Sequence, residues 1–376
     1  MVEPICLLRA NPLERVQKSY LDYSLPQKAH RRYFMRHPTV RGTYYEMGYH
    51  YGKERVKNGF KMPTSSEDEL AFANTSEAEI KRVFPEILQE ITGLADACDV
   101  PYEQAAAMLF NIGVFKAKPE CSVLASFTNS EVLVGRNYDF FYSFKKYDES
   151  YLTCPDKGYW SLGHTDILIG RDDGINEKGL AIAMTSVEPA ARESRPGMTF
   201  CVTVRCVLDK CANVKEGVRV LTDVKHISTY NFLLADKEGN MAVVEASPEK
   251  VRVRKPQEGE NFLVCANHFV HPEMQDMENL SARNTSEWDS LPRYTTISNV
   301  LREYNSKINV AIVENILSDH SGYVCSHQEK IKLGTLWSIV ISLKELQLFR
   351  AEGHPCKAKY RQDPRLINAL NKRKTQ

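Results

Sequence analysis

The feature that most constrains the fold is an abrupt change in hydrophobic periodicity near residue 120. Upstream, residues 42–60 and 76–100 place apolar and aromatic side chains at helical spacing, and the second segment begins with a Ser-x-x-Glu cap-like motif at Ser76. Downstream, short β-branched runs are separated by turn signals. Gly93, inside the helical part, predicts a close helix crossing or an early helix end. Helices on both sides of a strand-rich stretch predict a layered α+β fold.

The predicted elements after residue 120 alternate in a definite order. Strands are predicted at 122–129, 131–141, 165–174, 179–187, 230–255 and 261–267, with turns at Asn129–Ser130, at 172–174 and at 237–240. Helices are predicted at 197–224, 293–305 and 309–319. Since no linker rich in Pro, Gly or Ser divides the chain, one compact domain built from two sequence parts is expected.

Composition excludes several classes of partner. The 376 residues are 43% hydrophobic and 26% charged, as in a well-packed soluble protein. The 49 basic and 48 acidic residues nearly cancel, so neither nucleic acid nor anionic lipid is an expected partner. No apolar run approaches the roughly 20 residues of a membrane span, and the N-terminus lacks the features of a signal peptide. A cytoplasmic protein with mostly reduced cysteines is therefore expected.

Cys121 begins a predicted strand, and two roles are open to it. A small buried cysteine can simply start a core strand. Alternatively, a cut before Cys121 would make it a chain terminus. Its own α-amine, which titrates at about 7.7–8.0, could then take the proton of a thiol that titrates at about 8.5. Such an enzyme needs no distant histidine, but it needs groups that position the amine and stabilise an oxyanion.

Arg136 and Asp139 are the candidates for positioning Cys121. They end the next predicted strand, so a hairpin turn at Asn129–Ser130 would bring them back beside the cysteine. Asp139 could accept a hydrogen bond from the ammonium, and Arg136 could donate to that carboxylate or to the thiolate. The alternative is a surface ion pair at the end of a strand.

Several motifs, taken in order, resemble a known group of enzymes. "ECSVLASF", "VGRNYDFFYSF" and "GINEKGLAIAM" resemble the choloylglycine hydrolase and penicillin V acylase group of N-terminal-nucleophile hydrolases. "GTYYEMGYHYG", "SDHSGYVCSH" and "TLWSIV" are similar to the acyl-coenzyme A:6-aminopenicillanic acid acyltransferase branch. The resemblance runs from about residue 42 to about residue 356, and the joint order of the motifs is more specific than any single one.

The resemblance implies roles by position. Cys121 matches the nucleophile, and Asn267 in "VCANHF" matches an asparagine whose side-chain N–H helps form the oxyanion hole. One such donor can be worth ~3 kcal/mol of barrier. The second donor in bile salt hydrolases is a backbone N–H at the position of Ser186. The full set of implied catalytic residues is Cys121, Arg136, Asp139, Ser186, Asn267 and Arg293, the last in "LPRYTTI".

The resemblance also implies the fold and the activity. It implies a four-layer αββα sandwich with two stacked antiparallel sheets, made as a precursor with residues 1–120 as its first part and 121–376 as its catalytic part. The expected reaction is hydrolysis of a linear amide C–N bond through an acyl thioester on Cys121, after autoproteolysis before that residue. The expected ligand is a small-molecule acyl amide or acyl thioester, with no cofactor, and a homo-oligomer is open.

Two other functions stay open at this stage. One is transfer of an acyl group from a thioester donor, such as an acyl-coenzyme A, to an amine. The other is an unprocessed relative that binds ligands without turnover, which is favoured by Glu120 because processed relatives often have glycine there. Ser186 stands where the bile-salt branch often has asparagine, which argues against a bile-salt specialist.

A second group of reactive side chains lies late in the chain. His320, Cys325 and His327 could be metal ligands or could include the base of a Cys–His pair. Zinc sites usually take four ligands in two spaced pairs, which this spacing does not supply. The family resemblance implies a structural role for this stretch, and no metal site is expected. Side chains in the aromatic run at 140–144 alternate in direction, so some are expected in the core and others in an apolar cleft.

Overall fold

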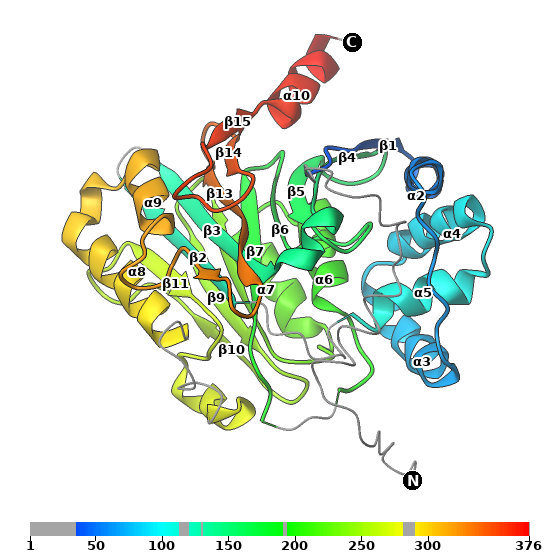
Figure 1. Ribbon diagram of the computed structural model, residues 1–376, viewed down its shortest axis with the longest axis horizontal. Helices are drawn as coiled ribbons and strands as arrows, with labels where there is room; N and C mark the ends of the chain where they lie inside the picture. The colour runs from blue at the N-terminus through cyan, green and yellow to red at the C-terminus, as the bar shows by residue number, and fades with distance from the viewer. Residues whose placement is uncertain (1–34, 113–119, 129–130, 191–193, 281–289, 376) are drawn as a thin grey trace.

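Two β-sheets stacked face to face form the centre of the molecule (Figure 1). The computed structural model describes residues 35–112, 120–128, 131–190, 194–280 and 290–375. Within these residues the first sheet has eight strands, in the spatial order β1 (Thr39–Gly42), β4 (Glu149–Pro155), β5 (Ser161–Thr165), β6 (Asp173–Asn176), β7 (Leu180–Ser186), β8 (Tyr230–Asp236), β9 (Met241–Ala246) and β10 (Val251–Arg254).

The second sheet carries the central strands of the site. Its order over the described residues is β11 (Phe262–Cys265), β2 (Glu120–Phe127), β3 (Val132–Phe141), β13 (Leu333–Ser342), β14 (Gln347–Ala351) and β15 (Arg361–Asp363), and β12 (His327–Gln328) pairs with β13. Both sheets are antiparallel except where β1 pairs in parallel with β4. The expectation of antiparallel sheets therefore holds for every described strand pair but that one.

Helices cover the outer face of each sheet. On the first sheet, α6 (Phe200–Lys210) and α7 (Val214–Asp223) pack Val207 and Leu221 against strand residues such as Leu234. On the second, α8 (Ser290–Tyr304) and α9 (Val310–Leu317) pack Ile297 and Val313 against strand residues in the same way. Each sheet thus buries one face on helices and the other on its partner sheet. The predicted αββα layering is confirmed.

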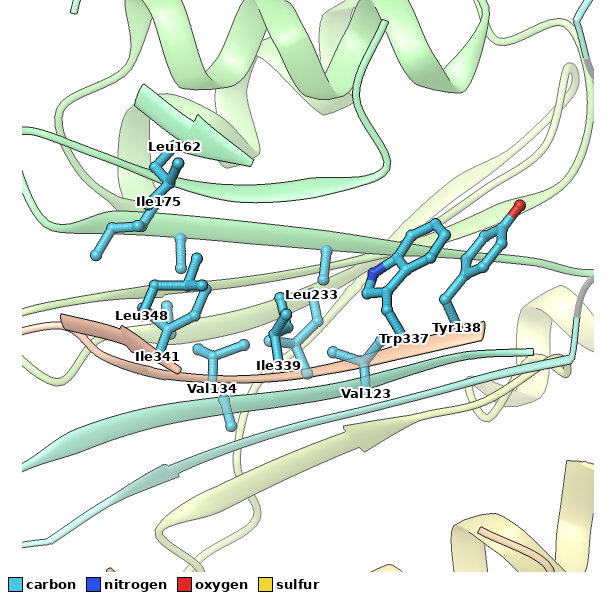
Figure 2. Close-up of a cluster of buried hydrophobic side chains, with 14 of the residues drawn as sticks. Val123, Val134, Tyr138, Leu162, Ile175, Leu233, Trp337, Ile339, Ile341 and Leu348 are labelled. Carbon is cyan, nitrogen blue, oxygen red and sulfur yellow. The ribbon is translucent and has the colours of Figure 1, made fainter. Parts of the chain in front are cut away.

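The main core lies between the sheets. Val123, Val134 and Ile339 of the second sheet meet Leu162, Ile175 and Leu233 of the first (Figure 2). At one end of this core, the rings of Tyr138 and Trp337 stack with centroids 3.9 Å apart. Because side chains alternate along a strand, neighbours such as Leu124 point outward to the helices.

A helical group flanks the first sheet beside β1 and β4 (Figure 1). It comprises α2 (Tyr44–Lys57), α3 (Glu67–Val83), α4 (Glu86–Cys98) and α5 (Tyr102–Phe110). A Cβ on Gly93 would lie 2.1 Å from the carbonyl oxygen of Tyr45, which confirms the predicted close crossing of α2 and α4. The predicted cap at Ser76 is wrong, because helical residues already precede it and the capping box is formed by Ser66 and Glu69.

Some predicted boundaries move for identifiable reasons. The helix expected at 197–224 is two helices, since Asn213 caps the start of α7. The strand and turn expected at 165–174 are wrong: β6 begins at Asp173, and the turn follows at 177–179 with Gly179 at φ 83°. The turn predicted at 237–240 is confirmed, with Gly239 at φ 90°, whereas Asn129–Ser130 lies outside the described residues.

Short elements complete the described chain. They are α10 (Arg365–Thr375) and the 3-10 helices Tyr142–Tyr147, Pro272–Met277 and Asn305–Lys307. Of the helices in the described residues, none combines the length and apolar character that crossing a membrane requires.

Candidate active site

The site is built around the paired strands β2 and β3. Cys121 stands opposite Tyr138, and Glu120 stands opposite Asp139, so the predicted hairpin pairing is confirmed. The side chain of Cys121 belongs to the core between the sheets and is fully buried in the intact chain. The central position of β2, between β11 and β3, fixes both the peptide before Cys121 and its thiol.

Arg136 connects the thiol to the opposite sheet. Its Nη2 donates to Cys121 Sγ at 3.6 Å, and its Nη1 donates to Asp173 Oδ2 in β6 at 2.6 Å. Burial raises the pKa of the Cys121 thiol to about 11, and the guanidinium of Arg136 acts in the opposite direction. Of the two partners predicted for Arg136, the structure has the sulfur and not Asp139.

A neutral histidine extends this contact. His164 Nδ1 lies 2.7 Å from Asp173 Oδ1, and His164 Nε2 lies 3.4 Å from Nη1 of Arg350. Since arginine can only donate, Nε2 accepts and Nδ1 carries the hydrogen that is donated to Asp173. Burial lowers the pKa of His164, in keeping with this neutral form. Asp173 therefore remains an anionic partner for Arg136. The hydrogen bonds to Asp173 and to Cys121 fix the position of the buried guanidinium.

The backbone of Cys121 is held at both of its polar atoms. Its N–H donates to Asn267 Oδ1 at 2.7 Å, and its carbonyl oxygen accepts from Arg293 Nη1 at 2.5 Å. Nη2 of Arg293 donates to Asn267 Oδ1 at 3.0 Å and also to the side chain of Glu120. Asn267 thus holds the N–H of the peptide that joins residues 120 and 121, while Arg293 holds the next carbonyl and the side chain of Glu120.

The side-chain N–H₂ of Asn267 points to a carbonyl group in the uncut chain. Its Nδ2 donates to the backbone oxygen of Ser186, at the end of β7, over 2.8 Å. The structure therefore brings Asn267 and Ser186 together next to Cys121, as the sequence predicted. Their roles as oxyanion donors stay predictions, because here the amide donor is occupied by Ser186 and the amide oxygen by Cys121.

Asp139 lies on the other face of the hairpin from the thiol. Residues three apart in a strand point to opposite sides, so Asp139 and Arg136 do not form the predicted hydrogen bond. Oδ1 of Asp139 accepts from Thr335 Oγ1 at 2.5 Å, and Oδ2 has no hydrogen-bond partner among the described residues. Burial raises the pKa of Asp139 to about 7, against the lowering effect of Arg293. Because both Arg136 and Asp139 are fully buried, the surface ion pair is excluded.

Sequence reasoning missed two partners of the site. Asp173 was assigned to a turn, although the Arg-Asp-Asp sequence that follows the apolar run 167–170 could have signalled buried carboxylates near a cation. Thr335 bonds Asp139 from the neighbouring strand β13, and nothing in the sequence distinguishes it from other strand threonines. Both contacts depend on which strands become neighbours.

A comparison with models of known protein families identifies the family of this chain. The model for acyl-coenzyme A:6-aminopenicillanic acid acyl-transferase matches residues 126–356, more than half of the chain. The chain belongs to this family. The match begins inside β2, just after Cys121, and includes the other implied site residues. Family membership assigns the protein to the enzymes of acyl transfer, the class that includes amide hydrolases and acyltransferases.

Several solved structures are similar to this chain at low sequence identity. Penicillin V acylase from Agrobacterium tumefaciens is 19% identical with a TM-score of 0.41, covering 62% of this chain and 82% of that chain. Two variants of conjugated bile acid hydrolase from Clostridium perfringens are 16% identical with TM-scores of 0.49 and 0.47, covering 65% of this chain and 92% of theirs. A search of curated protein sequences gives no significant match.

Proposed function

We propose that this protein is a cysteine N-terminal-nucleophile amidohydrolase that cleaves a linear amide C–N bond of a small molecule. The observation that carries the proposal is the hold on Cys121. Its N–H, its carbonyl and its thiol are bound by Asn267, Arg293 and Arg136 respectively. A merely structural cysteine has no need of three dedicated polar partners. We further place the enzyme in the cytoplasm, where such a thiol stays reduced.

Maturation cleaves the peptide bond between Glu120 and Cys121 and makes Cys121 an N-terminal nucleophile. Cys121 Sγ attacks the carbonyl carbon of Glu120, the C–N bond breaks as the C–S bond forms, and the thiol proton ends on the released nitrogen. Water then hydrolyses this thioester, which frees residues 1–120 with a new carboxylate and restores the thiol. The side chain of Glu120 is already bound by Arg293, so a glycine is not required before the nucleophile for the peptide to be held.

The released amine is the base of the turnover reaction. The neutral α-amine of Cys121 takes the thiol proton, and the thiolate attacks the substrate carbonyl. The tetrahedral oxyanion is bound by the side-chain N–H₂ of Asn267, which gives up its contact with the Ser186 carbonyl, and by the backbone N–H of Ser186. The protonated amine gives its proton to the leaving nitrogen, and water releases the acyl group as an acid.

An acyltransferase is the second candidate, and the name of the matching family favours it. The acyl thioester on Cys121 would then form from a thioester donor, and an amine would replace water in the second step. Both reactions use the same nucleophile and oxyanion donors. Steady-state rates with amide donors and with acyl-thioester donors, each with and without an added amine, separate them.

Intact mass and N-terminal sequencing test the proposal. Purified wild type is expected as two fragments, the larger of which begins with Cys121, while Cys121→Ala stays a single chain. The matched control is Cys265→Ala, which alters a fully buried cysteine of the adjacent strand β11 and should still be cut. A wild-type chain that is uncut and fully active would refute the terminal-amine mechanism. An uncut chain that binds acyl amides without turnover would instead favour the non-catalytic alternative.

A further inference from the structure

Two histidines and two cysteines converge where β12 and the segment before it meet the loop between β14 and β15. They are His320, Cys325, His327 and Cys356, and their possible ligand atoms all lie within 4.8 Å of one another. Cys325 Sγ is 3.4 Å from His327 Nε2, which is 3.2 Å from Cys356 Sγ. The sequence interpretation considered the first three residues and missed the fourth, which lies 29 residues beyond His327.

These separations match the edges of a tetrahedral metal site. With Zn–S bonds of about 2.3 Å and Zn–N bonds of about 2.0–2.1 Å, a sulfur and a nitrogen ligand of one Zn²⁺ lie about 3.6 Å apart. The two S–N distances that involve His327 are already this short. The widest pair in the cluster needs to close by only about 1 Å to reach the same geometry. Two thiolates would also neutralise the charge of the ion.

The backbone around the cluster is held in place before any ion binds. The N–H of Cys325 donates to the carbonyl of Asp319 at 2.8 Å, and the N–H of Tyr323 donates to the carbonyl of His320 at 3.2 Å. His327 is fixed by its pairing with Gly334 in β13. A ligand set presented by hydrogen-bonded backbone loses less conformational freedom when the ion binds.

Cys356 comes from a separate segment, the loop between β14 and β15. In that loop, the ring of His354 packs on the ring of His327 with centroids 3.8 Å apart. Nδ1 of His354 is buried and has no hydrogen-bond partner among the described residues. Two chain segments therefore direct nitrogen and sulfur atoms to one point, where an ion would join them.

We propose that His320, Cys325, His327 and Cys356 bind one Zn²⁺ as a structural site. Two thiolates and two imidazoles in tetrahedral arrangement are a donor set that favours zinc over magnesium, calcium or manganese. Four protein ligands leave no open position for water or substrate, so the ion stabilises the fold and takes no part in acyl transfer. This inference is independent of the proposed function and replaces the expectation that the chain has no metal site.

The site would also support the wall of the active site. Ser326, between two of the ligands, donates its backbone N–H to Thr335 Oγ1 at 3.0 Å. The same hydroxyl donates to Asp139 Oδ1 at 2.5 Å. Zinc therefore fixes the segment that orients Thr335, and Thr335 in turn orients the carboxylate of Asp139.

Elemental analysis of the full chain, purified without metal-chelating resin from zinc-supplemented culture, tests the site directly. Wild type should carry about one zinc per chain. Cys356→Ser, made at the ligand from the distant loop, should lose it. Cys98→Ser, at a half-buried cysteine of α4 outside the cluster, is the matched control and should keep it. Replacement of zinc by Co²⁺ in wild type should give the visible absorption of tetrahedral cobalt bound by thiolate, and Cys356→Ser should lack that absorption.

A milder variant keeps the test decisive if Cys356→Ser fails to fold. His320 is exposed, so His320→Ala removes one ligand with little loss of packing. Its zinc Kd, measured by competition with a chromogenic chelator, should rise by more than the 10- to 100-fold that loss of an outer-shell partner costs. Wild type without zinc and without a cobalt–thiolate spectrum, or a non-reduced mass that shows a Cys325–Cys356 disulfide in place of metal, would overturn the proposal.

Discussion

The two faces of the β2–β3 hairpin present different polar groups to Cys121 and its neighbour Glu120. On the inner face, between the sheets, Arg136 places a positive charge on the Cys121 thiol and anchors itself on Asp173 across the sheet gap. On the outer face, Arg293 of α8 binds the Cys121 carbonyl and the side chain of Glu120, and Asp139 stands opposite Glu120 in the strand pair. The inner face holds the sulfur of Cys121, whereas the groups of the outer face lie around the residue that cleavage would remove.

The thiol of Cys121 and the backbone around it therefore lie in two different electrostatic environments. A buried thiol resists ionisation, and only the cation on the inner face opposes that resistance. A buried carboxyl such as Asp139 has its pKa raised to about 7, so it gains most from a new ammonium partner. Variants on the two faces should therefore change activity in different ways.

The largest effect is expected at Asn267, which binds the backbone nitrogen of Cys121. Asn267→Asp keeps an oxygen for the Cys121 N–H and for Arg293 but loses the N–H₂ donor to the oxyanion. We expect kcat to fall by ~10²–10³-fold with little change in KM. The fraction of cleaved chain on a gel should stay near the wild-type value, because the acceptor that holds the peptide is kept. A fall in kcat of less than about twofold would remove Asn267 from the oxyanion hole.

The next effect compares the inner and outer faces directly. Arg136→Lys keeps the positive charge but loses the planar fork that reaches sulfur and carboxylate together. We expect a rate loss of about 10-fold or more with little movement of the acidic limb of kcat/KM against pH. Asp139→Asn keeps size but loses the charge that stabilises the ammonium, so the pKa of the α-amine falls. Its acidic limb should move to lower pH while the maximum rate drops.

Two controls keep this comparison clear. Both variants must be measured on cleaved protein, since a defect in maturation would lower activity at every pH. Lys344→Met, just after β13 at the end of the hairpin opposite Cys121, removes an ammonium that lies 5.9 Å from the centre of the Phe127 ring and should give the wild-type profile. Identical pH profiles for Arg136→Lys and Asp139→Asn would show that the two faces do not have separate roles.

Sequence reasoning reached the hairpin but not the division between its faces. The alternation of "ECSVLASF" and "VGRNYDFF" predicts two paired strands, and the family resemblance names Cys121, Arg136 and Asp139 together. The spacing of three between Arg136 and Asp139 already places them on opposite sides of a strand. What the sequence could not provide is the identity of the neighbours, because Asp173 and Thr335 come from strands whose positions are fixed only by long-range pairing.

The same limit applies to the wider fold. The helix crossing at Gly93 follows from a local glycine in a helical pattern, and it is confirmed. The strand predicted at 165–174 fails because a continuous apolar run has no periodicity that separates a strand from a buried loop. Cys356 joins His327 only after β13 and β14 pair, so the late cluster could not be recognised from spacing.

The smallest expected effect concerns Thr335, which links the outer face to the late cluster. Thr335→Val removes the hydroxyl that donates to Asp139 and accepts from Ser326, with little change in shape. The hydrogen bond from Thr335 lowers the pKa of Asp139, which burial raises to about 7, so its loss penalises the ionised carboxylate most. The variant should therefore be destabilised more above the folded pKa than below it. Hydrogen bonds to charged groups contribute about 1.5–3 kcal/mol, and neutral ones about 0.5–1.5 kcal/mol.

The sign of this pH dependence is the test. A carboxyl whose folded pKa lies above its unfolded value stabilises the fold at low pH and loses that contribution as the pH rises through the folded pKa. In the uncut Cys121→Ala chain, the loss of unfolding free energy caused by Thr335→Val, from urea titration, should be greater near pH ~8 than near pH ~5. Thr335→Ser keeps the hydroxyl and should show no such difference. An equal loss at both pH values would mean that Thr335 supports the fold through Ser326 alone and does not act on Asp139.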